Sequence, residues 1–139
     1  MVKDFHHFKG KELSRSEKIQ KKVVQLILNM NDNESESSII WELKHSAGCC
    51  QIGRILALKR GLDIELAEII SILHDIYAII NGKYKDHAKK GAIIAQKMLE
   101  ESNEFSDKEI EIIVKAIEKH SQKEIYSDDP YVELAKDVD

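Results

Sequence analysis

The sequence predicts an all-α fold, a compact bundle of about five to seven helices. Apolar residues recur at intervals of three and four along most of the chain, which is the period of an α-helix, and no segment alternates as a half-buried strand would. The 139 residues include only six glycines and one proline, so few positions interrupt a helix. A chain of this length is expected to form about one domain with its own core.

The N-terminal half is predicted to contain three helices. The first is expected over residues 16–30, where the apolar side chains fall on one face. The second is expected over residues 39–60, because Gly61 suits the left-handed position that ends many helices. The third, over residues 64–79 with Asp63 as its N-cap, is apolar on nearly all sides. We therefore expect this third helix to be the central and most buried one.

The C-terminal half is predicted to contain three more helices. Asp86 is a suitable N-cap for a helix over residues 87–101. A capping box that begins at Ser106 predicts a helix over residues 107–121. A polar, loop-like stretch follows, and residues 131–139 are expected to form the last helix.

The charge and composition exclude several classes of protein. The 21 basic and 25 acidic residues give a net charge of −4, which argues against sequence-independent binding to nucleic acid or to an anionic membrane. No run approaches the roughly 18 apolar residues of a membrane span, and the N-terminus lacks the apolar segment of a secretory signal. The adjacent Cys49 and Cys50 cannot form a disulfide framework. We expect a cytoplasmic protein without a membrane or nucleic-acid partner.

A histidine and an aspartate lie side by side in the most apolar segment. His74 and Asp75 fall within residues 69–76, which should be fully buried. A buried ionised carboxylate costs several kcal/mol unless it is paired with a cation or a metal. A hydrogen-bonded core pair, or an aspartate that faces a solvent-filled crevice, would also account for this dipeptide.

Three further histidines favour a metal site. His45 lies in the second predicted helix, His87 opens the fourth, and His120 closes the fifth on its inward apolar stripe. A single inward histidine is more often a hydrogen-bonded core residue than a ligand. Four of them on four predicted helices, with a buried carboxylate, favour one or two divalent metal ions. Imidazole and carboxylate suit Fe, Mn, Ni or Zn, and Mg is also compatible.

The order of these residues resembles that of a known family. His45, then His74-Asp75, then an aspartate near the C-terminus is similar to the ligand order of the HD-domain superfamily of metal-dependent phosphohydrolases. The resemblance covers residues 39–139. The sequences around the two later histidines are similar to those of members that hold two metals, including symmetrical dinucleoside tetraphosphatases.

The resemblance implies a domain organisation and an activity. It implies a single HD-type domain over residues 1–139, with a helical extension at 1–37 and the metal-binding core at 38–139. It also implies hydrolysis of a phosphoester or phosphoanhydride in a small-molecule substrate, a nucleotide or a related phosphate compound. Two metals about 3.5–4 Å apart would polarise the phosphoryl group and lower the pKa of the attacking water.

The resemblance also implies a ligand set. The expected metal ligands are His45, His74, Asp75, His87, His120 and Asp139. Asp75 would also be catalytic, because it would bridge the two metals. Asp137 is the alternative to Asp139 as the last ligand. Relatives continue past this aspartate, so either the last carboxylate is a weak ligand here or the chain is shortened.

A second departure from the family concerns the substrate phosphate. Many relatives place Gly-Lys shortly after the His-Asp pair, whereas this chain has Ile76-Tyr77-Ala78. Another basic side chain would have to bind the phosphate in its place. The candidates are Lys89, Lys90, Arg54 and Lys123, although a charge of this kind is more often a solvated surface group.

Other interpretations of the same residues stay open. The chain could be a catalytically inactive metal- or nucleotide-binding regulatory module, a di-iron oxygenase of related fold, or a helical scaffold without metal. Cys49 and Cys50 are expected to pack rather than to bind metal. Trp41 and Tyr77 either pack or stack on a nucleobase. A homodimer is compatible with the sequence.

Overall fold

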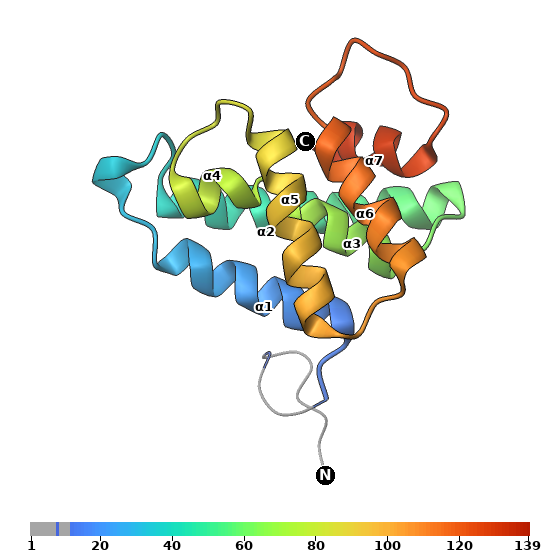
Figure 1. The fold of residues 1–139 in the computed structure, drawn as a ribbon, viewed down its shortest axis with the longest axis horizontal. Helices are drawn as coiled ribbons and strands as arrows, with labels where there is room; N and C mark the ends of the chain where they lie inside the picture. The colour runs from blue at the N-terminus through green and yellow to red at the C-terminus, as the bar shows by residue number, and fades with distance from the viewer. Residues whose placement is uncertain (1–7, 9–11) are drawn as a thin grey trace.

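The computed structural model describes Phe8 and residues 12–139. Over this part of the chain it is all-α, as predicted, with seven α-helices, one 3-10 helix and no strand (Figure 1). The bounds of the elements are α1 Arg15–Leu28, η1 Asp32–Glu34, α2 Ile39–Arg60, α3 Ile64–Leu73, α4 Ile76–Asn81, α5 His87–Ser102, α6 Asp107–Lys119 and α7 Pro130–Val138. None of the described helices has both the length and the apolar character needed to cross a membrane. The helical extension predicted at residues 1–37 falls only partly within the described residues, because residues 1–7 and 9–11 lie outside them.

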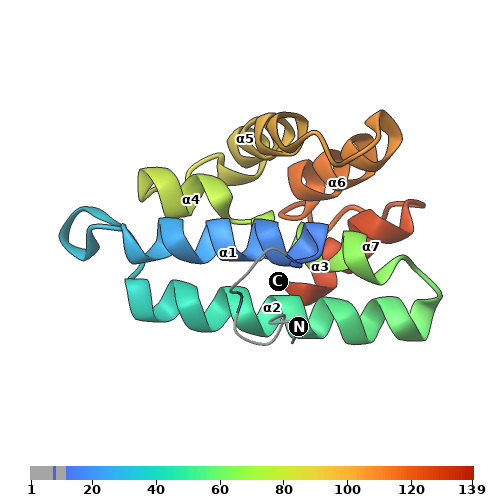
Figure 2. The ribbon, with the colours of Figure 1, turned by 90° about the horizontal axis from the view of Figure 1, so that it is seen from below.

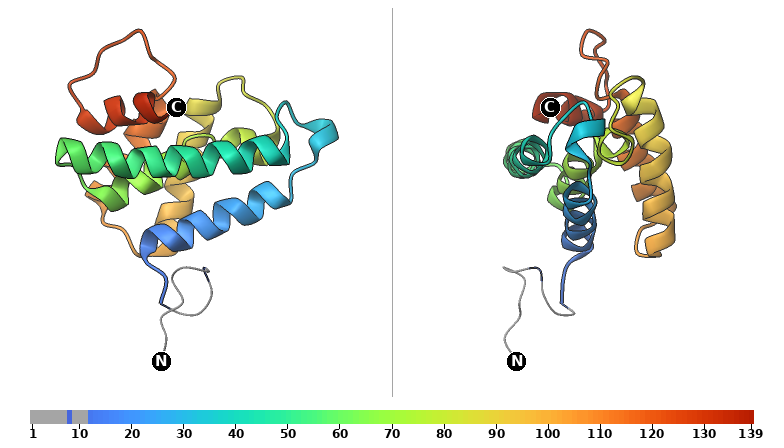
Figure 3. Two further views of the ribbon diagram at one scale, coloured as in Figure 1. Left: turned by 180° about the vertical axis from the view of Figure 1, so that it is seen from behind. Right: turned by 90° about the vertical axis from the view of Figure 1, so that its left-hand side faces the viewer.

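The helices are arranged in layers. The long helix α2 lies on one side, α1, α3 and α4 lie in the middle, and α5 and α6 cover the other side (Figures 2 and 3). Helix α7 packs against α2, α3 and α6. Because α3 contacts α1, α2, α6 and α7, it is enclosed by its neighbours.

The core forms around α3. Ile69, Ile70 and Leu73 of this helix have no exposed surface, and Val23 and Ile27 of α1 are equally buried in the same cluster. The prediction that this apolar segment is central and buried is confirmed. The helix can be apolar on nearly all sides because, past the exposed Ile64 at its start, most of its surface is covered by neighbouring helices.

The helix ends mostly follow the capping signals in the sequence. Gly61 adopts the left-handed conformation after α2, with a φ of 68°. The carboxylate of Asp63 accepts a hydrogen bond at the start of α3, and Ser106 and Glu109 form the expected capping box of α6. Asp86 differs: it precedes α5, but its φ is 55° and its side chain makes no capping hydrogen bond. The position of Asp86 before the helix was predicted correctly, whereas the prediction that its side chain caps the helix is wrong.

The third predicted helix is divided in two. Residues 64–79 were expected to be continuous, but α3 ends at Leu73 and α4 begins at Ile76. His74 Nδ1 lies 2.6 Å from the Ser71 carbonyl, which would accept the amide of Asp75 in an uninterrupted helix. Asp75 leaves helical geometry, with φ −106° and ψ 18°. The apolar period runs through both helices, so it does not reveal the break.

Candidate metal centre

The six predicted ligands come from separate elements and meet at one place. His45 lies in the middle of α2, and His74-Asp75 form the break between α3 and α4. His87 is the first residue of α5, and His120 caps the C-terminus of α6. Asp139 follows α7. Their donor atoms form two groups, which share Asp75.

The first group contains His45, His74, Asp75 and Asp139. The two imidazole Nε2 atoms lie 3.2 Å apart. Asp75 Oδ2 lies 3.3 Å from His45 Nε2 and 3.2 Å from His74 Nε2. Asp139 Oδ1 lies 3.4 Å from each of these nitrogens. Two nitrogens and two oxygens therefore surround one point.

The second group contains Asp75, His87 and His120. Asp75 Oδ1 lies 3.3 Å from His87 Nε2 and 3.7 Å from His120 Nε2. The two nitrogens lie 3.1 Å apart. Asp75 thus presents one carboxylate oxygen to each group, as a bridging carboxylate does.

Backbone carbonyls fix the orientation of three of the imidazoles. The Nδ1 atoms of His74, His87 and His120 lie 2.6, 2.9 and 2.6 Å from the carbonyl oxygen three residues earlier in the chain. A carbonyl oxygen can only accept, so each Nδ1 carries the hydrogen and each neutral ring presents the lone pair of Nε2. All three Nε2 atoms lie close to the carboxylate of Asp75. Without a cation among them, acceptor atoms would face one another.

The electrostatics of the site favour positive charge. Hydrogen bonds to Asp139 and Asp75 raise the pKa of His45 to about 12. Burial lowers the pKa of His74, but the two carboxylates more than compensate and raise it to about 10. Burial alone would raise the pKa of Asp75, yet the imidazoles hold it well below its usual range. The pKa of Asp139 is lowered in the same way by His45 and His74.

The donor set fits a divalent transition metal. Ligands that share one metal through bonds of about 2.0–2.2 Å are themselves about 2.8–3.6 Å apart. The separations in the first group fall within that range, and those in the second are close to it. His120 has no exposed surface, and His74 and Asp75 have 1% and 3%. A carboxylate as buried as that of Asp75 requires a charged partner, either a protonated imidazole or a metal ion.

Two neighbouring side chains bear on the ligand set. Asp137, the alternative last ligand, pairs instead with Arg60 at 2.6 Å. Cys49 Sγ lies 3.6 Å from His45 Nε2 and donates to the Val138 carbonyl at 3.2 Å, within a small apolar cluster. The thiol therefore packs, and it also lies close enough to His45 and His74 to bind a metal with them.

The predicted substrate-binding cations lie at different distances from this centre. Lys123 Nζ lies 2.9 Å from Asp139 Oδ2, on the loop between α6 and α7 that arches away from the bundle (Figure 1). Arg54 pairs with Glu68 at 3.2 Å, and Lys90 lies over the Tyr77 ring, 5.1 Å from its centroid. Lys89 is exposed. The described contacts join only Lys123 of these four to the centre.

A buried network beside the centre was not predicted from the sequence. Glu42 has no exposed surface, and its Oε1 accepts hydrogen bonds from the hydroxyls of Tyr84 and Ser37. The backbone carbonyl of Tyr84 is the one that faces His87 Nδ1. The available signal was the spacing of Glu42 from His45, three residues along one helix, which places both on the same face.

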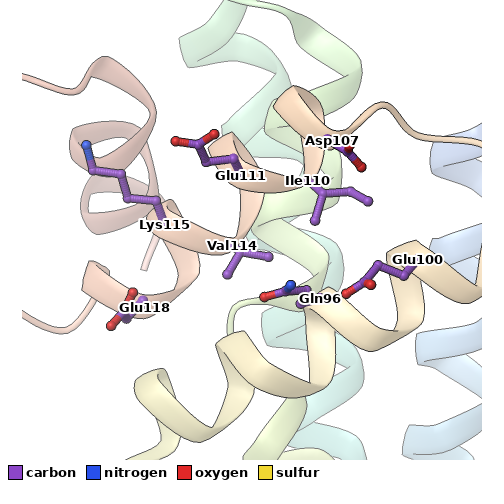
Figure 4. Close-up of a pocket in the computed structure, with 8 residues that line it drawn as sticks. All are labelled: Gln96, Glu100, Asp107, Ile110, Glu111, Val114, Lys115 and Glu118. Carbon is purple, nitrogen blue, oxygen red and sulfur yellow. The ribbon is translucent and has the colours of Figure 1, made fainter.

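A separate groove lies between α5 and α6 and has a volume of about 390 Å³ (Figure 4). Gln96 and Glu100 of α5 and Ile110 and Val114 of α6 line it. None of its lining residues is a candidate ligand. This groove is therefore not part of the metal centre.

A helical bundle in which histidines and aspartates of separate helices surround two adjacent points defines a class of all-α metal-centre proteins. The HD-domain family model matches residues 43–139, and the chain belongs to this family, the HD-domain superfamily of metal-dependent phosphohydrolases. The matched region contains all six predicted ligands. Searches of curated proteins and of solved structures found no match.

Proposed function

We propose that the protein hydrolyses a phosphoester or phosphoanhydride bond of a nucleotide or a related phosphate compound. The observation that carries this proposal is Asp75, which presents one oxygen to His45 and His74 and the other to His87. Divalent metals such as Fe, Mn, Ni or Zn, with Mg also compatible, would polarise the phosphoryl group and acidify the attacking water. Membership of the family supports the same class of reaction.

The residues of the chain would hold and orient these ions. His45, His74, Asp75 and Asp139 would bind one ion, and His87 and His120 would bind a second together with Asp75. The carbonyl partners of Nδ1 keep each Nε2 directed at the ion, which is the usual role of groups behind a metal ligand. Burial of His74, Asp75 and His120 keeps bulk water away from that side of the centre.

Lys123 is the cation that the geometry supports best for the substrate phosphate. Its ammonium group pairs with Asp139, so a rotation of a flexible side chain would bring it to a phosphate bound at the centre. It would offset negative charge on the phosphoryl oxygens. Lys89, Lys90 and Arg54 stay predictions that the described contacts do not support. We also infer a cytoplasmic location, which is consistent with the free thiols of Cys49 and Cys50.

The test compares the same substitution at two aspartates, Asp75 in the proposed centre and Asp137, which pairs with Arg60 instead. Protein purified without added metal is analysed for bound elements, reloaded with Mn, Fe, Ni or Zn, and assayed on nucleoside phosphates, dinucleoside polyphosphates and cyclic nucleotides. We expect hydrolysis by the wild type and by Asp137→Asn, and loss of both metal and turnover in Asp75→Asn. Bound metal without turnover of any phosphate compound would instead indicate the regulatory module. Full metal binding by Asp75→Asn would contradict the proposed centre.

A further inference from the structure

A cleft of about 410 Å³ lies beside the metal centre, at the start of α2. Its lining residues are Glu36, Ser37, Ser38, Trp41 and Tyr84. Small-molecule sites are typically about 300–1,000 Å³ in volume, so the cleft is large enough for part of a substrate. None of these residues is a candidate metal ligand.

The two aromatic side chains of the cleft each contact one group of the metal centre. The Trp41 ring stacks on His45, with centroids 4.3 Å apart and planes inclined by 20°. The Tyr84 ring meets His87 edge-on, with centroids 5.3 Å apart. The cleft therefore adjoins both ligand groups through the rings of Trp41 and Tyr84. A phosphate compound bound at the metals would extend an attached group along these rings.

The walls of the cleft are held in place before any ligand binds. The Tyr84 hydroxyl donates to buried Glu42, which also accepts from Ser37 at 2.7 Å. The Ser38 hydroxyl accepts the backbone N–H of Trp41 at 3.0 Å and so fixes the first turn of α2. A preorganised site loses less conformational entropy on binding than a mobile one.

The chemistry of the lining favours a flat, uncharged aromatic group. Trp41 is 47% exposed, which leaves a large aromatic surface in contact with water beside the centre. Glu36 is the one charged residue among the described residues that line the cleft; it would repel a phosphate but could accept hydrogen bonds from amino groups. Serine hydroxyls offer further polar partners. A phosphate therefore belongs at the metals, and a planar base with polar edges belongs in the cleft.

We propose that this cleft binds the nucleobase of a nucleoside phosphate whose phosphates lie at the metal centre. This inference rests on the proposed phosphohydrolase function and assigns Trp41 and Tyr84 as the base-binding residues. Stacking on aromatic side chains tolerates every base, because each base has a π-face. The cleft thus selects nucleotides over phosphate compounds that have no aromatic group.

The test uses pairs of ligands that differ by the nucleoside. The full-length, metal-loaded protein is titrated with ATP and with tripolyphosphate, and dissociation constants are measured by calorimetry. Trp41 is the single tryptophan of the chain, so its fluorescence independently reports stacking. We expect ATP to bind more tightly than tripolyphosphate and to quench this fluorescence to saturation. Equal affinity of the two ligands, or no binding of ATP, would overturn the inference.

Variants separate stacking from support of the metal centre. Trp41→Ala should weaken ATP binding by about 5- to 150-fold, the range for loss of one base–aromatic stack, and change the affinity for tripolyphosphate by less than about twofold. Trp41→Phe should restore most of the ATP affinity. Ile40→Ala, at an exposed neighbouring position, should change neither constant. A parallel loss for both ligands in Trp41→Ala would show that Trp41 only supports His45, and would overturn the inference.

The outcome is distinguishable from failure of the proposed function. Selective binding of ATP without hydrolysis of any phosphate compound would support base binding in the cleft and contradict the proposed phosphohydrolase activity. Hydrolysis of both ATP and tripolyphosphate, with equal dissociation constants for the two, would support the phosphohydrolase activity and contradict base binding in the cleft.

Discussion

At the scale of single residues, the centre consists of side chains that could bind a metal ion and of others that hold these side chains in position. Glu42 belongs to the second kind, because its buried carboxylate binds the hydroxyl of Tyr84, whose own carbonyl faces His87. Glu42 Oε2 has no hydrogen-bond partner in the described structure, so the bonds to Oε1 matter more. Removing a hydrogen-bond donor from a buried carboxylate lowers the stability of the folded protein.

Removal of the Tyr84 hydroxyl tests this network. Tyr84→Phe keeps the ring and the carbonyl but leaves Glu42 with Ser37 as its single donor. We expect the free energy of unfolding to fall by about 1.5–3 kcal/mol, the usual worth of a hydrogen bond to a charged group. Chemical denaturation measures this change. Tyr126→Phe, at a tyrosine that is 79% exposed, is the control and should change it by less than about 0.5 kcal/mol.

Lys123 is expected to act on the substrate rather than on stability. Lys123→Ala should lower kcat/KM by about 10- to 100-fold, because a charge-assisted hydrogen bond to phosphate is worth about 1.5–3 kcal/mol. Metal content should be unchanged, since Lys123 would bind no metal. Lys97→Ala, on the exposed surface of α5, should have wild-type kinetics. Equal kcat/KM values for the two variants would contradict the proposal that Lys123 binds the substrate phosphate.

At the scale of elements, an ion-pair network joins the start of α1 to α3 and α6. The Arg15 guanidinium donates to Glu65 at 2.6 Å, to Glu109 at 2.9 Å and to the Glu104 carbonyl at 2.8 Å. It also lies over the Phe105 ring, 4.6 Å from its centroid. Three segments that are distant in the sequence are therefore linked by one side chain.

Loss of this network should be measurable in the unfolding equilibrium. We expect Arg15→Ala to lower the free energy of unfolding by about 1–2 kcal/mol, more than an isolated surface pair is worth. Lys18→Ala removes the more exposed pair of Lys18 with Glu104 and should cost at most about 0.5 kcal/mol. Equal costs would show that the network adds nothing beyond ordinary surface pairing.

The contribution of Arg15 should also depend on pH. Arg15 lowers the pKa of Glu109 from 4.5 to about 2 in the folded protein. A carboxylate with a lowered folded pKa stabilises the protein above its unfolded pKa, and this contribution is lost as the pH falls toward the folded pKa. The stability difference between wild type and Arg15→Ala should therefore be full at about pH 6 and smaller at about pH 3. A difference that does not shrink on acidification would contradict this assignment.

The elements themselves were largely predictable, for identifiable reasons. The start of α2 and its end before Gly61, the cap at Asp63 and the capping box at Ser106 are local signals, and the structure has each of them. The break at His74 is different, because it arises from an imidazole that takes up a backbone carbonyl. An apolar period of 3.6 residues is the same with or without that break.

At the scale of the whole molecule, the convergence of the histidines was predictable and the cleft was not. An inward position on a core helix follows from periodicity, so His45 and His120 could be expected to point to the interior. Tyr84 lies on the loop that precedes α5 and lines the cleft together with Trp41 of α2, and the conformation of a loop does not follow from its sequence pattern. The sequence likewise identified the types of ligand but could not decide whether Asp139 or Asp137 is the last one. Their spatial neighbours distinguish them, because Asp139 lies beside His45 and His74 whereas Asp137 pairs with Arg60.

Metal should stabilise the folded molecule as a whole, and more so at higher pH. Stripped of metal, the centre needs protons, and the raised pKa values of His45 and His74, about 12 and about 10, provide them. A histidine with a raised folded pKa contributes full stability below its unfolded pKa, about 6.5, and loses it as the pH rises through the folded value. Bound metal replaces these protons, and protons compete with it at low pH.

The prediction is therefore a gap between loaded and metal-free protein that widens with pH. Free ion at 100 times its dissociation constant adds about 2.7 kcal/mol per site to the unfolding free energy. We expect the gap in Tm to be larger at about pH 8.5 than at about pH 6, measured by thermal unfolding after chelation and after reloading. Asp137→Asn should reproduce the wild-type gap, whereas Asp75→Asn should have almost none, because both ion sites lose the carboxylate that they share. A gap that is equal in the two variants would mean that metal binds elsewhere on the chain.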